Sequence, residues 1–429
     1  MENKKKYIVR REYFGAYVFD RETQLDYIFG EESAKVFKIV LNNPGQLEKQ
    51  DYENLCNLGF ISNGRDINFD YFENPIFGEC FSAPIVVHFP YTDRCNLNCK
   101  HCFSKNGGLR RALSFGKRLE ILDEFQKIGV CKIMVGGGEP FLCDDIIPFL
   151  EESVARGLVT KVFSNGLSFD DQTIESLSKI DLGGISISVD TPVRQVYEKI
   201  RGVDELPRVI GNIKKLVEKC PFPVSISATI GSYNLGHEKA LLKLAAKCKA
   251  FKLKVRPVRP CGNAGKNLDV LPTADAYAGF LKKIQQAYSQ NRDKYLFKLD
   301  LHWGSGKIVA SKTRLDLTKT PNPYGEFGCI AGKDIAFIDT DGTVLPCGFL
   351  PAMTDAKDSI LDSKLIDIWR ESPNFKFIRE LNANPKCYRC RYYCSCRGGC
   401  PARNIHNGLD YSDCDPWCPK DFFPILLSD

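Results

Sequence analysis

The sequence predicts an α/β protein built around a partial (β/α)6 TIM-like barrel, with a winged-helix-like α+β domain before it and a cysteine-rich domain after it. Three observations predict this arrangement. Short apolar runs alternate about six times with helical stretches between Pro84 and Gln290, which is typical of a parallel sheet. Before them, short alternating segments precede two helical stretches. After them, cysteine and glycine replace the apolar rhythm.

The first domain is predicted over residues 1–78. Its pattern from Tyr7 to Phe29 alternates and turns like a short antiparallel meander. Helical spacing follows from Glu31 to Leu41 and again up to about Leu58. A segment rich in Asn, Asp and Phe, from about Asn63 to Ser82, is predicted to be a linker.

The barrel is predicted over residues 82–300. Its six strand candidates read IVVHF, KIMVGG, KVFSN, ISISV, VSISATI and LKVRPV. In parallel sheets of this kind, binding sites lie at the carboxyl ends of the strands. The segments at those ends are Thr92 to Cys102, Gly136 to Glu139, Ser164 to Gly166, Asp190, and Arg256 to Arg259.

Composition limits the classes of partner and compartment. The formal charge of +6 is spread along the chain, so nucleic acid is not expected as a partner. No export signal and no apolar run near 20 residues is seen, so we expect a cytoplasmic protein without membrane contact. Nineteen cysteines in such a chain favour metal binding over disulfides. Seven scattered ones are expected to be plain buried apolar residues: Cys56, Cys80, Cys131, Cys143, Cys220, Cys248 and Cys261.

Three cysteines follow the first barrel strand at the spacing Cys95-x3-Cys99-x2-Cys102. Three thiolates can hold a four-iron cluster and leave one iron unligated. Structural zinc usually takes four protein ligands, and the only further candidate nearby is His101. The spacing therefore favours an iron–sulfur cluster with one open iron.

With this triplet after strand one, residues 84 to 290 resemble the radical S-adenosylmethionine superfamily. The resemblance implies a bound S-adenosylmethionine, whose reductive cleavage gives a 5′-deoxyadenosyl radical. It also implies a set of cofactor contacts at the strand ends. These are His101, Gly137, Gly138, Glu139, Pro140, Ser164, Asn165, Ser188, Asp190 and Arg201.

Each of these contacts also has an ordinary structural explanation. A glycine-rich turn such as Gly137-Gly138 is common in loops, and Ser164, Asn165 and Asp190 suit turns or helix caps. Glycine also lets a ligand approach the backbone, and a carboxylate suits an ammonium group. Arginine suits a cofactor carboxylate through bidentate pairing, although a solvated helix end is the simple alternative for Arg201.

The last domain is predicted over residues 316–429, where seven cysteines recur at fixed intervals that resemble the SPASM domain. That resemblance implies two auxiliary 4Fe-4S clusters, and hence three 4Fe-4S clusters in all. The first auxiliary cluster would use Cys329, Cys347 and Cys400, and the second Cys387, Cys390, Cys396 and Cys418.

Several details of this domain stay open at the level of sequence. The first auxiliary cluster either keeps an open iron or takes Cys394 as its fourth ligand. For the second, Cys418 fits the late position better than Cys414. A zinc ribbon is the alternative for Cys387 and Cys390.

The N-terminal domain resembles a RiPP recognition element, which binds the leader of a precursor peptide as an added strand. A structural cap or an ordinary winged helix is the alternative. With this domain, the resemblance implies a peptide maturase supplied with electrons by a reductant such as flavodoxin or ferredoxin.

The favoured reaction is a thioether cross-link from a cysteine sulfur to carbon in a ribosomally made precursor peptide. The alternatives are a carbon–carbon cross-linking cyclase, a sulfatase-maturase-like formylglycine-forming enzyme, and a non-enzymatic iron–sulfur electron carrier. The sequence does not indicate the oligomeric state or the stereochemistry of the product.

Overall fold

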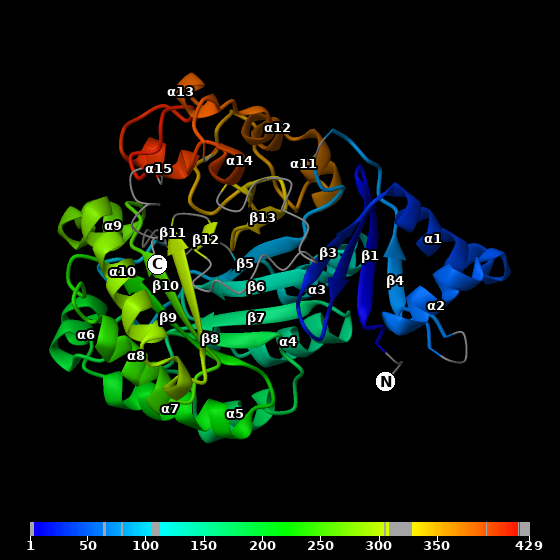
Figure 1. Ribbon diagram of the computed structural model, residues 1–429. Helices are drawn as coiled ribbons and strands as arrows, with labels where there is room; N and C mark the ends of the chain where they lie inside the picture. Colours follow the sequence, from blue (N-terminus) through cyan, green and yellow to red (C-terminus); the bar gives the residue numbers. More distant parts are fainter. Residues whose placement is uncertain are drawn as a thin grey trace.

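The computed structural model describes residues 4–62, 66–78, 80–103, 112–303, 306–308, 328–391, 393–418 and 420. In this part of the chain the strands form two sheets (Figure 1). The smaller sheet has the order β3-β2-β1-β4, and the larger one β12-β11-β10-β9-β8-β7-β6-β5-β13-β14. No helix of these residues is long and apolar enough to cross a membrane.

The N-terminal sheet is a meander completed by a strand from the linker. Strands β1 (Tyr7–Glu12), β2 (Gly15–Asp20) and β3 (Asp26–Phe29) are antiparallel, followed by α1 (Glu31–Asn42), η1 (Pro44–Gln46) and α2 (Lys49–Asn57). The predicted meander and helices are confirmed. Strand β4 (Phe69–Phe72) was wrongly assigned to a linker, because its pairing parallel to β1 depends on contacts distant in sequence.

The larger sheet contains all six predicted barrel strands, which run parallel to one another. They are β5 (Val86–Thr92), β6 (Lys132–Gly137), β7 (Val159–Ser164), β8 (Gly184–Ser188), β9 (Val224–Ile230) and β10 (Lys252–Pro257). The helical elements between and after them are α3 (Phe115–Lys127), η2 (Pro140–Leu142), α4 (Ile146–Ala155), α5 (Asp171–Leu177), α6 (Arg194–Arg201), α7 (Leu206–Lys219), α8 (Glu238–Lys247), α9 (Asn263–Lys266), η3 (Leu268–Val270) and α10 (Ala274–Ser289).

The sheet extends beyond the predicted strands at both edges. After η4 (Arg292–Lys294), strand β11 (Lys298–Trp303) adds parallel to β10, and β12 (Gly306–Ile308) turns back against it. At the other edge, β13 (Ile335–Ile338) pairs parallel with β5 and antiparallel with β14 (Val344–Leu345). The C-terminal region is thus joined to the barrel by main-chain hydrogen bonds.

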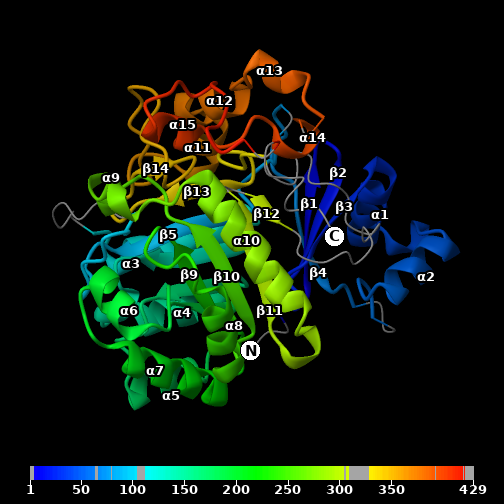
Figure 2. The same cartoon turned by 60° about the vertical axis from the view of Figure 1, so that its left-hand side comes forward.

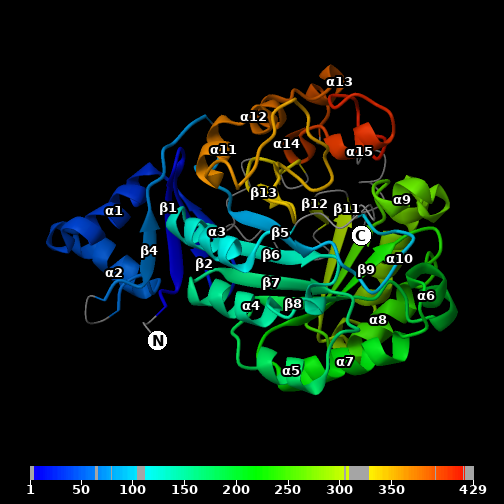
Figure 3. The same cartoon turned by 180° about the vertical axis from the view of Figure 1, so that it is seen from behind.

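Alternation along β5 distinguishes the two faces of the sheet. Phe89 belongs to the main apolar core and packs against Phe125 of α3 and Phe149 of α4, on the helix-covered face (Figures 2 and 3). Its neighbour His88 lies on the opposite face. His88 is exposed on this face, but desolvation by the surrounding protein lowers its pKa to about 4, and Arg256 of β10 lowers it further. Four strands separate β5 from β10, so this proximity requires a sheet curled into a partial barrel.

The C-terminal region lies over the β5 edge of the sheet (Figure 1). It contains α11 (Leu365–Glu371), α12 (Pro373–Glu380), α13 (Pro385–Tyr388), α14 (Tyr393–Cys396) and α15 (Pro401–His406). Trp369 of α11 is fully buried and donates its indole N–H to the carbonyl of Phe81 at 2.8 Å. Thr340 donates to the carboxylate of Asp93, just before the cysteine triplet, at 2.9 Å.

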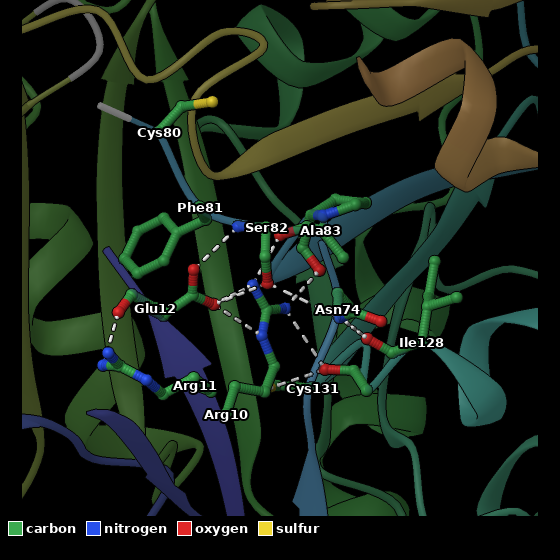
Figure 4. A network of polar contacts seen from close by, with 12 residues as sticks. Arg10, Arg11, Glu12, Asn74, Cys80, Phe81, Ser82, Ala83, Ile128 and Cys131 are labelled. Carbon is green, nitrogen blue, oxygen red and sulfur yellow. Dashed lines mark hydrogen bonds and ion pairs between the residues drawn. The ribbon is translucent and has the colours of Figure 1, made fainter. Parts of the chain in front are cut away.

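A buried ion pair fastens the N-terminal sheet to the barrel (Figure 4). Arg10 of β1 has no exposed surface and donates to Oε1 of Glu12 at 2.6 Å. It also donates to the carbonyl oxygens of Ala83 and Pro84, which lead into β5, at 2.7 and 3.1 Å. Glu12 accepts from the backbone N–H of Ser82 at 2.7 Å. The two charges neutralise each other on β1, and their further hydrogen bonds tie this strand to the segment that leads into β5.

Replacing Arg10 with Met should strongly destabilise the chain, because Glu12 would remain buried without its cation. Loss of one partner of a buried pair costs about 3–5 kcal/mol. Denaturant unfolding of the metal-free protein measures the difference.

The control is Lys35→Met, which removes an ion pair to Glu32 on the exposed surface of α1 and should leave the unfolding midpoint unchanged. Equal midpoints for the two variants would show that the Arg10 pair does not hold the domains together.

Candidate active site

The loop carrying the cysteine triplet lies directly against the loop that follows β6. The N–H of Gly138 donates to the carbonyl of Thr92 at 2.6 Å, and that of Glu139 to the carbonyl of Arg94 at 2.8 Å. A Cβ at position 138 would lie 2.1 Å from the Arg94 oxygen, so only glycine permits this approach. The glycines of this segment therefore have a structural role in positioning the triplet.

Two further loops bind the other end of the triplet. The N–H of Lys100 donates to the carbonyl of Ile200 in α6 at 3.0 Å. Asn263, after β10, donates its backbone N–H to the carbonyl of Cys102 at 2.8 Å and its amide Nδ2 to the carbonyl of Cys99 at 3.2 Å. The loop is thus held through its backbone at several points, which fixes the positions of its three thiols.

The three thiols differ in exposure: Cys95 is exposed, Cys102 is half-buried and Cys99 is buried. Burial raises the pKa of Cys99 to about 11, although Arg201 lowers it. The metal-free thiol is therefore protonated near neutral pH, and iron binding must displace its proton. No three Cys, His, Asp or Glu side chains in the described ranges converge on a single ion. A four-iron cluster needs no such convergence, because each thiolate binds a different iron.

A buried carboxylate lies beside the exposed end of the triplet. Glu139 has no exposed surface and accepts from the N–H of Asn165 at 2.7 Å and from the hydroxyl of Ser164 at 2.9 Å. Burial raises its pKa to about 7 against the effect of these hydrogen bonds. The amide of Asn165 also donates to Oδ1 of Asn96 at 2.7 Å and lies 4.0 Å from Sγ of Cys95.

On the opposite side of the triplet, Asp190 and Arg201 form a buried ion pair. Nε and Nη2 of Arg201 lie 2.8 and 2.7 Å from Oδ2 of Asp190, and Thr229 donates its N–H to Oδ1 at 3.0 Å. Burial acts to raise the pKa of Asp190, but Arg201 and His101 outweigh it and the pKa is lowered. The two predicted contacts are therefore a single unit, with Arg201 using two of its five N–H groups on Asp190.

His101 leaves a buried nitrogen available at this site. Its Nε2 lies 3.4 Å from Asp190, and its ring centroid is 5.8 Å from that of Tyr233. Burial lowers the pKa of His101 to about 4, so the imidazole is neutral. Among the described residues, neither its Nδ1 nor the hydroxyl of Tyr197 has a hydrogen-bond partner. Buried polar atoms of this kind are costly unless a ligand satisfies them.

The remaining predicted residues lie on the same edge of the sheet. Gly137 ends β6, Pro140 begins η2, and Ser188 ends β8, two residues before Asp190. Three thiols, a buried carboxylate, an ion pair and two unpaired polar atoms fit an iron–sulfur cluster with a bound amino-acid-like cofactor. Asn263 and Tyr233, which brace the site, had no sequence signal, because they follow β9 and β10, where no predicted motif falls.

The first group of C-terminal cysteines shares a small apolar core. Cys329, Cys347 and Cys400 lie in one cluster with residues such as Ala331 and Leu350. Burial raises the pKa of Cys329 to about 12, and Cys400 and Cys347 are the next largest influences on it. The predicted ligands of the first auxiliary cluster therefore come together in the fold.

The second group is gathered around Cys387. Burial raises the pKa of this thiol to about 11, and Cys414, Cys418 and Cys390 raise it further. Both late cysteines are thus close to Cys387, and the choice between them stays a prediction. The side chain of Cys394 lies outside the described residues.

Residues 89–245 match the radical SAM superfamily, and residues 329–394 match an iron–sulfur cluster-binding domain. The region that matches the superfamily contains the cysteine triplet, Glu139, Asp190 and Arg201. These two matches support an enzyme, and together with the likeness to a solved structure they confirm the predicted fold class.

Relatives of this chain act on different substrates. The mycofactocin maturase of Mycobacterium tuberculosis is 27% identical over 352 residues, covering 80% of this chain and 84% of the relative. The AdoMet-dependent heme synthase of Methanosarcina barkeri is 25% identical, covering 79% of this chain and 97% of the relative. The crystal structure of Streptococcus suis SuiB bound to precursor peptide SuiA has a TM-score of 0.75 and 19% identity, and covers 96% of this chain and 98% of SuiB.

The raised pKa of Glu139 predicts a pH-dependent stability of the metal-free protein. The ordinary pKa is 4.5 and the folded value about 7, so the unfolded chain releases this proton at lower pH. As the pH rises from 4.5 to about 7, the free energy of unfolding of the wild type should fall by about 3 kcal/mol relative to that of Glu139→Gln. Urea unfolding of both proteins at pH 5 and pH 8 measures the difference.

An exposed control, Glu218→Gln on α7, should keep the pH dependence of the wild type. If Glu139→Gln also kept the pH dependence of the wild type, the buried carboxyl group of Glu139 would not titrate between pH 5 and pH 8.

Proposed function

We propose that this enzyme modifies a ribosomally made precursor peptide by radical chemistry, with a thioether between a cysteine sulfur and carbon as the favoured product. The observation that carries the proposal is the cysteine loop held beside Glu139 and the Asp190–Arg201 pair, at the carboxyl ends of the barrel strands. The mycofactocin maturase and SuiB likenesses support a peptide substrate.

Each residue of the site has a proposed role. Cys95, Cys99 and Cys102 would ligate three irons of a 4Fe-4S cluster. The cluster and S-adenosylmethionine, when bound, would together supply a 5′-deoxyadenosyl radical for hydrogen abstraction from the substrate. Glu139 and Asn165, on the exposed side of the triplet, would contact the ammonium end of the cofactor.

Further groups would contact the rest of the cofactor. The remaining N–H groups of Arg201 suit its carboxylate, with Asp190 fixing the guanidinium. Gly137, Gly138, Pro140, Ser164 and Ser188 would line the same edge. Nδ1 of His101 offers an acceptor inside the site, and its ring would pack near the adenine.

We assign the N-terminal sheet the role of binding the precursor's leader. Strands β3 and β4 form its two edges, and a peptide can add to such an edge as a further strand. The likeness to SuiB covers 96% of this chain, which supports a leader-binding role because that structure contains a precursor peptide.

The auxiliary cysteines would hold two further 4Fe-4S clusters that accept the electron left on the substrate, with flavodoxin or ferredoxin as the external reductant. A carbon–carbon cross-link is the second candidate, because the same hydrogen abstraction would start it. A formylglycine-forming reaction is less favoured, because it gives no role to a leader-binding sheet. The heme synthase relative shows that a related radical SAM core can serve another substrate class.

The reconstituted, reduced enzyme should cleave S-adenosylmethionine to 5′-deoxyadenosine, and Cys99→Ala should abolish this cleavage because the cluster loses a ligand. Cys248→Ala, which changes a cysteine in the main apolar core, is the matched control. Liquid chromatography of the nucleoside measures turnover. Cleavage by the Cys99 variant at the wild-type rate would remove the triplet from the mechanism.

Incubated with its encoded precursor peptide, the reduced enzyme should give a product lighter by two hydrogens, detected by mass spectrometry. Omitting the leader from the peptide should abolish the change, because the core segment would no longer be delivered. A leaderless peptide modified as fast as the full precursor would refute a leader-binding role for the N-terminal sheet.

A further inference from the structure

Cys261 differs from the other scattered cysteines in its surroundings. It lies four residues beyond β10, is 8% exposed, and donates its N–H to the carbonyl of Arg259 at 2.8 Å. Cys131 and Cys248 belong to apolar core clusters, as expected of cysteines that act as plain buried residues. Cys261, like Cys80, belongs to none of the apolar clusters found among the described residues. The contacts of its loop therefore define its surroundings.

The loop that carries Cys261 reaches the first group of auxiliary cysteines. Arg259 lies with Nη1 3.6 Å from Sγ of Cys400, and its guanidinium carbon lies 4.3 Å from the ring centroid of Phe349. Cys400 and Phe349 both belong to the small core of the proposed ligands, so the loop that carries Cys261 packs against that core. Burial raises the pKa of Cys261 to about 12, Arg259 lowers it, and Cys347, Cys102 and Cys400 raise it further.

The backbone around Cys261 is fixed against the triplet loop. Gly262 has a φ of +58°, and a Cβ there would lie 2.3 Å from the carbonyl oxygen of Phe103. The N–H of Asn263 donates to the carbonyl of Cys102. Both following residues are held in this way, so the backbone after Cys261 is fixed against the triplet loop, while Arg259 on its other side contacts Cys400.

We propose that Cys261 is the fourth thiolate ligand of the auxiliary cluster held by Cys329, Cys347 and Cys400. The inference rests on the proposed assignment of these three residues, which alone leave one iron without a protein ligand. On ligation the thiol of Cys261 loses its proton to solvent and its sulfur binds that iron, with no change in oxidation state. The cluster then has no open iron for a substrate thiolate, and it serves as an electron acceptor.

Cys261 is not assigned to the radical SAM cluster, although Cys102 also influences its pKa. A fourth thiolate there would fill the iron needed for S-adenosylmethionine. The contact of Arg259 with Cys400 also places this loop at the auxiliary group. Arg259 would then donate an N–H to a cluster thiolate, which favours the reduced cluster because it stabilises negative charge.

The test removes the radical SAM cluster first. In a parent chain with Cys95, Cys99 and Cys102 all changed to Ala, the protein is reconstituted anaerobically with iron and sulfide. Adding Cys261→Ala should lower the iron content by about one atom per chain and give the EPR signal of an oxidised three-iron cluster. Adding Cys329→Ala is the reference, and it should remove iron from the same cluster.

Two further variants of the parent are compared. Cys248→Ala, in the main core, should keep the iron content and spectrum of the parent. Cys394→Ala should also keep them if Cys261 is the ligand. Far-UV circular dichroism of each metal-free variant identifies any that fails to fold. If Cys261→Ala fails to fold, Cys261→Ser is used in its place. It should keep the helix content of the parent and change the EPR spectrum of the reconstituted protein.

The outcomes separate the two proposals. If Cys329→Ala changes neither iron nor spectrum, the auxiliary assignment and this inference both fail. If Cys329→Ala removes iron but Cys261→Ala leaves the parent spectrum intact, only this inference fails. A three-iron signal from Cys394→Ala instead of Cys261→Ala would likewise overturn it. If Cys261→Ala changed the iron content only in a chain that keeps Cys95, Cys99 and Cys102, the thiol would belong to the cluster of that triplet, and the inference would fail.

Discussion

The site depends on one constraint, which is that three thiols must be held in fixed positions on a single short loop. The loop is not a regular element, so hydrogen bonds from its neighbours hold it. Gly138 and Glu139 bind its first half, while α6 and Asn263 bind its second half. These partners come from three different strand ends. The parallel register of the sheet brings them to one edge, and the fold therefore creates the site by fixing the order of its strands.

Two buried carboxylates flank this loop, and their surroundings give them opposite properties. Glu139 is hydrogen-bonded by neutral donors, which do not compensate for its burial, so its pKa rises to about 7. Asp190 contacts the guanidinium of Arg201, and its pKa falls below the ordinary value despite burial. One side of the triplet therefore offers a carboxyl group that a nearby cation can ionise. The other offers a permanently charged pair with a net charge of zero.

The sequence predicted the parts of the molecule whose signals are local. The six barrel strands are periodic, and the triplet and the Gly137-Gly138-Glu139 segment have recognisable spacing. Strand β4, strand β11 and the pairing of β13 with β5 were not predicted, because short strands depend on distant partners for their stability. The burial of Arg10 and the surroundings of Cys261 likewise arise from contacts between regions remote in sequence.

The loop after β10 joins the two functional regions of the chain. Asn263 in this loop donates its backbone N–H to the carbonyl of Cys102. Arg259, four residues earlier in the sequence, lies with its guanidinium next to the sulfur of Cys400. Cys102 and Cys400, which are 298 residues apart in the chain, are thus both contacted by one short segment, and Gly262 allows its close approach to the triplet loop. A displacement of this segment would alter both groups together. In the proposed function, where both groups hold clusters, such a shared support would keep the clusters at a constant separation.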